Sequence, residues 1–195
     1  MHSRPMPTDT QCGTIRQLRP SDFPRFRDHL LRLDHQSRRD RFNGSTDDHS
    51  LKAYAARCFI DGTTVVGCMD EAHVIGAAEL HERPDRPDPT AEIAFSVEQP
   101  FQRRGIGRRL FERLIIHALA LGYTKLHVTT HAQNAAMKAL ARSFNATLTF
   151  EEGETVGEIV LDPMLEPGLR RIRVATADSS TGFPDQKRQL AAIVN

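Results

Sequence analysis

The sequence predicts an α+β fold (α/β in the broader sense), with a mixed central sheet flanked by helices. Apolar residues recur at helical spacing over 107–121, and β-rich runs stand on either side of that segment at 91–97 and 125–130. Two more β-rich runs, 63–69 and 73–80, are separated by a short polar break of the kind that closes a hairpin. Because a full helix separates 91–97 from 125–130, these two strands should be parallel neighbours joined by a right-handed crossover.

The elements on the N-terminal side of this βαβ unit follow from local patterns. Weak alternation predicts an edge strand at 14–18, and Pro20-Ser21-Asp22 supplies the N-terminal cap of a helix at 23–33. We interpret the Arg-rich segment 37–44 as a polar connection. It leads to a second helix at about 47–59, where apolar residues return at i, i+3 and i+7.

Local sequence patterns also predict the elements on the C-terminal side of the βαβ unit and the loop that precedes the unit. Three prolines make 83–89 a loop, and Gly122 is expected to end the helix 107–121. A further helix is predicted at 134–144, and a hairpin formed by 147–151 and 155–161 completes the sheet.

Length and composition indicate one domain with appendages. The chain has 195 residues, against a prior of roughly 150 residues per domain. We assign 14–162 to this domain and 1–13 to a flexible N-terminus. The segment 163–195, rich in Pro, Gly, Ser, Thr and Arg, is assigned to a C-terminal tail.

Charge and hydropathy exclude several classes of function. Lys and Arg total 26 against 25 for Asp and Glu, so the net charge of +1 gives no electrostatic basis for a nucleic-acid or membrane-surface binder. No run approaches the ~18 apolar residues of a membrane span, and the first residues lack the apolar block of a secretory signal. The three cysteines lack metal-site spacing. We therefore expect a cytoplasmic protein without a metal; the sequence does not indicate its oligomeric state.

The strongest chemical signal is the string Gln102-Arg103-Arg104-Gly105-Ile106-Gly107, between a strand and a helix. A glycine-rich turn that opens a helix directs backbone N–H groups at one spot, and the helix dipole adds partial positive charge there, which suits a pyrophosphate. Arg108 and Arg109 add to the cations at this end. A polyanion would neutralise them, although an Arg-rich solvated first turn is the alternative.

Two better-known phosphate loops do not fit this string. A Walker loop needs Gly, four residues and then Gly-Lys-Ser/Thr, which the chain lacks. A dinucleotide fingerprint needs a third small residue where Leu110 stands, and an acidic ribose ligand where Thr130-His131 ends the next strand. Neither an NAD enzyme nor a P-loop NTPase is indicated.

The string resembles the acetyl-CoA loop of the Gcn5-related N-acetyltransferase (GNAT) family, whose pattern is Gln/Arg-x-x-Gly-x-Gly/Ala. Gln102, Gly105 and Gly107 match it, and the order of elements over about 14–162 is similar as well. Three short motifs are similar to the bacterial protein-lysine acetyltransferase branch of that family. They are Ala91-Glu92-Ile93-Ala94-Phe95-Ser96-Val97, Asn134-x-x-Met137-x-x-Leu140-Ala141 and Ser37-x-x-x-Arg41-Phe42.

This resemblance implies where the cosubstrate acetyl-CoA binds. The strand 91–97 should splay from 125–130, with pantetheine inserted between them and held by backbone groups near Val97. The pyrophosphate should lie on the amides of 102–107. The residues implied to bind the cofactor are Val97, Gln102, Arg103, Arg104, Gly105, Ile106, Gly107, Arg108 and Asn134. Asn134 also suits an ordinary N-cap.

The chain departs from the family pattern at the general acid. Many members carry a Tyr before a Gly-Phe pair to protonate the departing thiolate, whereas this chain has Ala141, followed by Asn145-Ala146. Asn tolerates the left-handed backbone conformation that the Gly of this pair adopts. The turn should therefore form here as well, although the Tyr that would act as the general acid is absent. The lysine acetyltransferase branch also lacks this Tyr, and His131 is an alternative proton donor.

Acetyl transfer to an amine requires a base, because a lysine has a pKa of about 10.4 and must lose a proton to attack. Glu92 and Glu79 are the candidate catalytic residues, since each interrupts an apolar strand where a carboxylate is costly without a partner. Glu92 also matches the acidic position of the lysine acetyltransferase branch. The alternative for Glu92 is a side chain without a catalytic role that faces solvent on an alternating strand. Glu79 is interpreted as a partner residue or as an alternate base. Cys68 has no neighbouring base and is expected to be a core residue rather than a nucleophile.

The sequence thus predicts an N-acetyltransferase that moves an acetyl group from acetyl-CoA to a protein lysine or a small amine by direct attack in a ternary complex. A catalytically silent acyl-CoA-binding module is the alternative, suggested by the missing Tyr.

Overall fold

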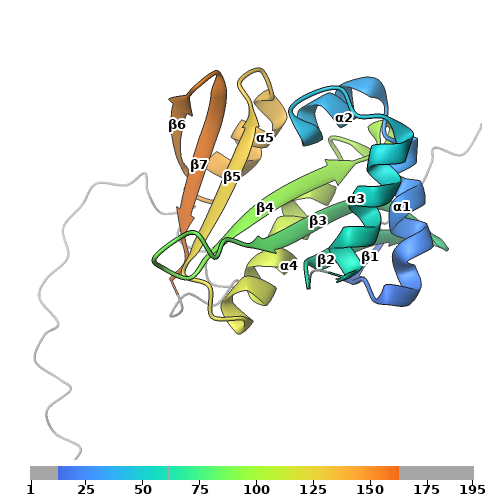
Figure 1. Cartoon of the computed structure of the whole chain (residues 1–195), viewed down its shortest axis with the longest axis horizontal. Coiled ribbons are helices and arrows are strands. Elements are labelled where there is room, and N and C mark those ends of the chain that lie inside the picture. The colour runs from blue at the N-terminus through green and yellow to red at the C-terminus, as the bar shows by residue number, and fades with distance from the viewer. Residues whose placement is uncertain (1–12, 61, 163–195) are drawn as a thin grey trace, which may run out of the picture. The chain divides into compact units, whose positions relative to one another are not determined.

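A computed structural model describes residues 13–60 and 62–162, so most of the predicted N-terminus and all of the predicted tail lie outside the described residues. Within the described residues, seven strands form one mixed sheet in the order β1-β2-β3-β4-β5-β7-β6, which can be followed in Figure 1. The strands are β1 Thr14–Gln17, β2 Thr64–Asp70, β3 His73–Glu82, β4 Thr90–Val97, β5 Lys125–His131, β6 Thr147–Glu151 and β7 Glu154–Val160. The α-helices are α1 Phe23–Arg32, α2 His35–Phe42, α3 Asp48–Ile60, α4 Ile106–Ala120 and α5 Ala135–Arg142, with 3₁₀ turns at Pro20–Asp22 and Gln99–Phe101.

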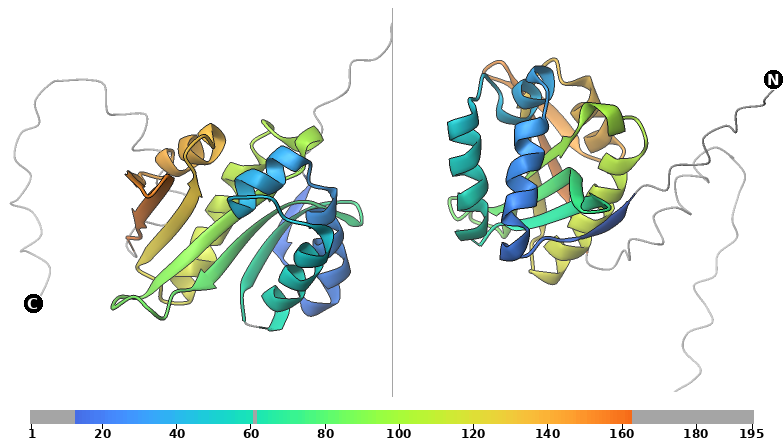
Figure 2. Two further views of the ribbon diagram at one scale, coloured as in Figure 1. Left: turned by 45° about the horizontal axis from the view of Figure 1, so that its top comes forward. Right: turned by 90° about the vertical axis from the view of Figure 1, so that its right-hand side faces the viewer.

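The helices cover the two faces of the sheet. Figure 2 shows α1 and α3 on one face, where Phe26 and Leu30 are buried against β2 and β3. The other face packs against α4 and α5, and the ring of Phe111 on α4 lies 4.2 Å, centroid to centroid, from that of Phe144, which follows the end of α5. The predicted α+β architecture is confirmed. None of the helices within the described residues is long and apolar enough to cross a membrane.

β4 and β5 are parallel neighbours joined through α4, as predicted. They pair over only three positions, where Thr90, Ala91 and Glu92 face Lys125, Leu126 and His127. Beyond these positions the two strands diverge into a fork, which is visible in Figure 1 between the β4 and β5 labels. The expected splaying of these strands is confirmed, and it separates the carboxyl ends of two adjacent strands.

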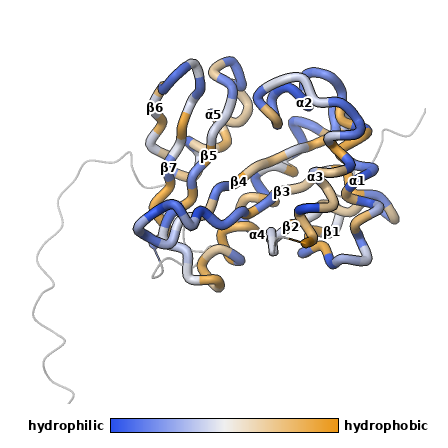
Figure 3. The backbone as a smooth tube through the Cα atoms, in the orientation of Figure 1, coloured by the Kyte–Doolittle hydropathy of each residue, from blue (hydrophilic) through white to orange (hydrophobic). Residues whose placement is uncertain are grey.

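The interpretation of 37–44 as a connection is wrong, because residues 35–42 form α2. Asp34 caps this helix by accepting a hydrogen bond from the Ser37 N–H at 2.7 Å, and Asn43 ends it in the left-handed region with φ of 53°. The helix has no buried residue and is largely hydrophilic, as the tube in Figure 3 shows. It therefore lacks the apolar stripe by which helices are recognised in a sequence.

Candidate active site

A cleft of about 480 Å³ lies where the end of β4 meets the start of α4. Its walls come from four parts of the chain: α2, the end of β4, the segment 101–108, and α5 with its cap. The lining residues are Ser37, Asp40, Arg41, Phe95, Ser96, Val97, Phe101, Gln102, Arg103, Gly105, Ile106, Gly107, Arg108, Asn134, Ala136, Met137 and Leu140.

The loop before α4 presents backbone amides to this cleft. Gly105 is the N-cap of α4 and has φ of +77°, a conformation that favours glycine. The Arg109 N–H donates to the Gly105 carbonyl at 3.1 Å, so the amides of 106–108 precede the first α-helical hydrogen bond. These amides and the helix dipole provide a place for phosphate oxygens.

Of the nine residues implied to bind the cofactor, eight line the cleft: Val97, Gln102, Arg103, Gly105, Ile106, Gly107, Arg108 and Asn134. Arg104 does not line it. Its guanidinium lies over the ring of Phe101, 5.6 Å from the centroid, so its placement does not support the predicted phosphate contact. The binding roles of the other eight stay predictions.

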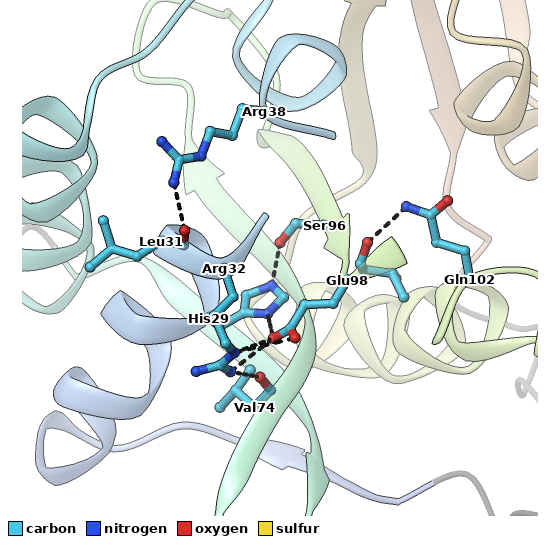
Figure 4. Close-up of polar contacts among 9 residues, drawn as sticks. His29, Leu31, Arg32, Arg38, Val74, Ser96, Glu98 and Gln102 are labelled. Carbon is cyan, nitrogen blue, oxygen red and sulfur yellow. Dashed lines mark hydrogen bonds and ion pairs between the residues drawn. The ribbon is translucent and has the colours of Figure 1, made fainter. Parts of the chain in front are cut away.

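The Gln102 side chain links three walls of the cleft through hydrogen bonds. Its Nε2 donates to the Val97 carbonyl at 2.9 Å and to the Ser37 Oγ at 3.1 Å, which ties the loop to the end of β4 and to α2. In Figure 4 the Gln102 side chain points back toward the end of β4. The glutamine of the motif therefore holds the loop through its side chain.

Asn134 is the N-cap of α5, which confirms the N-cap interpretation; its predicted contact with the cofactor stays a prediction. Its Oδ1 accepts from the Met137 N–H at 2.9 Å, and its Nδ2 donates to the Thr130 Oγ1 at 2.9 Å. The cap thus fixes the start of α5 beside the fork of β4 and β5.

A buried polar network holds the other side of β4. The ring of His29 on α1 is fully buried and contacts the Ser96 Oγ at 2.9 Å and the Glu98 Oε1 at 3.0 Å, as Figure 4 shows. Arg32 donates to the same carboxylate at 2.8 Å. Burial would raise the pKa of Glu98, but the bonds from His29 and Arg32 keep it below its ordinary value. The network ties α1 to the strand end that forms the cleft wall.

A second recess of about 350 Å³ occupies the fork itself. It shares five lining residues with the cleft, which are Asp40, Arg41, Phe95, Asn134 and Met137. Glu92 lines this second recess and does not line the first. The two spaces thus adjoin, one beside the phosphate loop and one beside a carboxylate.

Glu92 remains accessible in this recess. Its side chain is 36% exposed and accepts from the Arg83 Nη1 at 3.0 Å. On β5, His127 faces it in the parallel register, and the His127 Nδ1 is buried without a hydrogen-bond partner among the described residues. Burial lowers the pKa of His127 and the charge of Glu92 opposes this, so a largely uncharged imidazole stands beside the carboxylate near neutral pH.

Glu79, the alternate base, is fully buried and lines neither recess. Its Oε2 accepts from the Arg41 Nη2 at 2.7 Å and from the Tyr54 hydroxyl, and contacts the His81 Nε2 at 3.2 Å. Burial would raise the pKa of this carboxyl, but the charge of Arg41 and the bonds from His81 and Tyr54 hold it well below its usual range. A carboxylate so strongly paired is a poor base. The partner interpretation fits Glu79 better than the catalytic one.

Other sequence candidates lie away from the two recesses. His131 ends β5, where its Nδ1 accepts from the Gln133 N–H, and Cys68 is buried within β2. Ala141 is buried in the core against α4, and Asn145 has φ of +61°, so the expected left-handed turn is confirmed. No group of His, Cys, Asp or Glu arranged to hold a metal occurs within 13–60 and 62–162.

Sequence reasoning missed Asp40 and Arg41 as lining residues, because both belong to the unpredicted helix α2. Arg41 belongs to the quoted motif Ser37-x-x-x-Arg41-Phe42, which was the one available signal. The position of His127 opposite Glu92 was missed because an alternating strand gives no indication of what faces each of its side chains; His127 itself lines neither recess.

The fork, the loop amides at the start of α4 and the adjoining recess with its carboxylate match the class predicted from the sequence, an acetyl-CoA-dependent N-acetyltransferase. The model of the Acetyltransferase (GNAT) family matches residues 18–146. The chain belongs to the GNAT family.

Individual proteins are similar to this chain in sequence or in fold. The chain is 37% identical to mouse N-alpha-acetyltransferase 80 over 83 residues, which is 43% of this chain and only 24% of the mouse protein. The GNAT domain of S. lividans PAT has a similar fold, with a TM-score of 0.65, 19% identity and coverage of 75% of this chain and 89% of that one. The structure of yncA from Salmonella typhimurium, solved with its cofactor acetyl-CoA, also has a similar fold. Its TM-score is 0.57 at 22% identity, and the match covers 79% of this chain and 96% of yncA.

Proposed function

We propose that this enzyme transfers the acetyl group of acetyl-CoA to the amine of a protein lysine or a small amine, by direct attack within a ternary complex in the cytoplasm. One observation carries the proposal. The cleft beside the phosphate loop adjoins a recess that presents the Glu92 carboxylate, so a donor in the cleft and an acceptor in the recess would meet where the two spaces share lining residues.

The residues of the cleft fit acetyl-CoA. An ideal Cβ built on Gly105 meets nothing within 4 Å, and one on Gly107 meets only Leu140 at 3.5 Å. The loop surface is therefore open to a phosphate, and the amides of 106–108 would hold the pyrophosphate. The end of β4 would hold the pantetheine. Acetyl-CoA supplies an activated acyl group as a thioester.

Glu92 is the group that removes the proton from the acceptor. Its carboxyl group is exposed to the recess and held by Arg83, so it is placed to attract an ammonium group and accept its proton. The amine nitrogen then bonds to the thioester carbonyl carbon, the carbon–sulfur bond breaks, and the electron pair leaves on sulfur. The nitrogen loses its second proton as the amide forms, and one proton passes to the thiolate sulfur, so that CoA leaves as the free thiol.

Kinetics of Glu92→Gln test this function. The amide keeps an oxygen for the Arg83 bond but cannot take the proton, so we expect turnover to fall by about 10²–10⁴ while acetyl-CoA affinity is unchanged. The residual rate should rise toward high pH, where an amine of pKa about 10.4 is already neutral. Glu151→Gln, on β6 outside both recesses, is the matched control and should keep wild-type turnover.

Two results would contradict this assignment. Full turnover in Glu92→Gln with loss in Glu79→Gln would put the base on β3. Full turnover in both variants would favour proton removal through water. A wild-type protein that binds acetyl-CoA and never releases thiol with any amine would instead be the silent binding module.

A further inference from the structure

The junction of the two recesses contains one cation. Among the five residues that line both spaces, the polar ones are Asp40, Arg41 and Asn134. Asn134 uses its amide oxygen to cap α5 and its nitrogen to bind Thr130. Asp40 is acidic and accepts from the Gln36 Nε2 at 2.9 Å. Arg41 is therefore the cation among the described residues that line both recesses, and its charge can stabilise an anion there.

Arg41 is held rigidly in place. Its Nη2 donates to the Tyr54 hydroxyl at 2.5 Å and to the Glu79 Oε2 at 2.7 Å. Its guanidinium lies 4.7 Å from the ring centroid of Phe42 and 5.3 Å from that of Tyr54, and the side chain is 10% exposed. A donor fixed in this way needs no reorganisation when charge develops nearby, which is the condition for electrostatic catalysis.

The guanidinium also has unused hydrogen-bonding capacity. Its Nε is buried and has no hydrogen-bond partner among the described residues, and both bonds to Tyr54 and Glu79 come from Nη2, which leaves Nη1 without a bond to either of them. An Arg that served only to neutralise Glu79 would not need to line the junction.

We propose that Arg41 is a further catalytic residue, which donates a hydrogen bond to the acetyl carbonyl oxygen as that oxygen becomes an oxyanion. The inference rests on the proposed function. As the amine nitrogen bonds to the carbonyl carbon, the π pair moves onto oxygen and is stabilised by the guanidinium. When the carbonyl reforms, the carbon–sulfur bond breaks and the pair leaves on sulfur. Arg41 gains and loses no proton in this sequence.

The test must separate this role from anchoring of α2. Replacing Arg41 alone would leave a buried unpaired carboxylate at Glu79, which is strongly destabilising. The double variant Arg41→Gln/Glu79→Gln removes both charges together. Arg16→Gln/Asp22→Asn is the matched control, because it removes another Arg–carboxylate pair, at 2.7 Å, whose residues line neither recess.

Three quantities are measured on each protein: kcat, the Kd of acetyl-CoA by calorimetry, and the melting temperature. For Arg41→Gln/Glu79→Gln we expect a fall in kcat of about 10²–10³, the usual effect of losing one oxyanion donor, with Kd within about threefold of wild type and a cooperative melt. The control pair should keep its kcat even if its melting temperature falls.

A kcat within about fivefold of wild type in the folded double variant would overturn the proposal and leave Arg41 as an anchor. So would a Kd raised in proportion to the loss of kcat, since that would show damage to the donor site. If the double variant does not fold, Arg41→Met/Glu79→Met replaces the buried pair with uncharged side chains that pack in its place, and a kcat within about fivefold of wild type there would overturn the proposal. Failure of wild type to transfer acetyl groups would refute the proposed function instead.

Discussion

Gly107→Glu should separate acetyl-CoA binding from stability. Gly107 lies in the first turn of α4 and lines the cleft, but the structure around it accepts a side chain. A Cβ there has its nearest neighbour at 3.5 Å, in ordinary contact with Leu140. Glu is a better helix former than Gly, and its charge is favourable at a helix N-terminus by about 0.3–1 kcal/mol. The melting temperature of the free protein should therefore stay the same or rise.

The same substitution should greatly weaken acetyl-CoA binding. A carboxylate about 4 Å from a phosphate charge costs about 1 kcal/mol in water and about 4 kcal/mol at the effective dielectric constant of a protein surface. These values correspond to losses of affinity from about fivefold to several hundredfold, before the side chain's own bulk is counted.

Calorimetric titration of acetyl-CoA and thermal melting of the free protein measure the two effects. Gly44→Glu is the matched control, because a Cβ there meets nothing within 4 Å and Gly44 lines neither recess. Unchanged affinity in Gly107→Glu would refute the placement of the pyrophosphate on this loop. An equal loss in Gly44→Glu would attribute the effect to net charge.

Two further predictions concern stability. A chain that ends after Asp162 should melt cooperatively and bind acetyl-CoA like the full chain. The reason is that Leu161 is buried and its N–H donates to the Thr124 carbonyl. Loss of either property would show that residues 163–195 are needed for the stability or the binding of the domain. The carboxyl of Glu79 has a lowered pKa, so its pair with Arg41 stabilises the fold above the ordinary carboxyl pKa of about 4.3 and this contribution is lost as the pH falls below it. Urea unfolding at pH 7 and pH 3 should thus show a smaller loss for Arg41→Gln/Glu79→Gln than for wild type, and equal losses would contradict this role of the pair.

The βαβ unit could be predicted because its signals are local and redundant. The apolar stripe of α4 contains Leu110, Leu114 and Ala118, all fully buried, and glycine marks both ends of the helix. The phosphate loop falls between two predicted elements, so its location followed once they were placed. Seven of the eight cleft-lining binding candidates lie in or next to this unit for that reason.

The α2 wall of the cleft could not be predicted, because tertiary contacts and not a local sequence pattern hold it in place. α2 has no buried residue, and Arg41 pairs with a glutamate 38 positions further along the chain. The sequence did indicate that carboxylates on apolar strands need a partner or a purpose. Only the family resemblance placed Glu92 ahead of Glu79; the local pattern alone could not distinguish Glu79, which has a buried partner, from Glu92, which faces an open recess. That distinction depends on which residues the fork and α2 bring to each position.

The central claim is direct acetyl transfer from acetyl-CoA to an amine, and its most direct test is a mass balance. The full chain is incubated with acetyl-CoA and a panel of lysine peptides and small amines, while thiol release, acetylated amine and the intact mass of the protein are followed together. Direct transfer predicts equal amounts of thiol and acetylated amine, with no acetylated form of the protein on the path. Thiol release that precedes amine acetylation, together with a protein that gains and then loses an acetyl group, would contradict it.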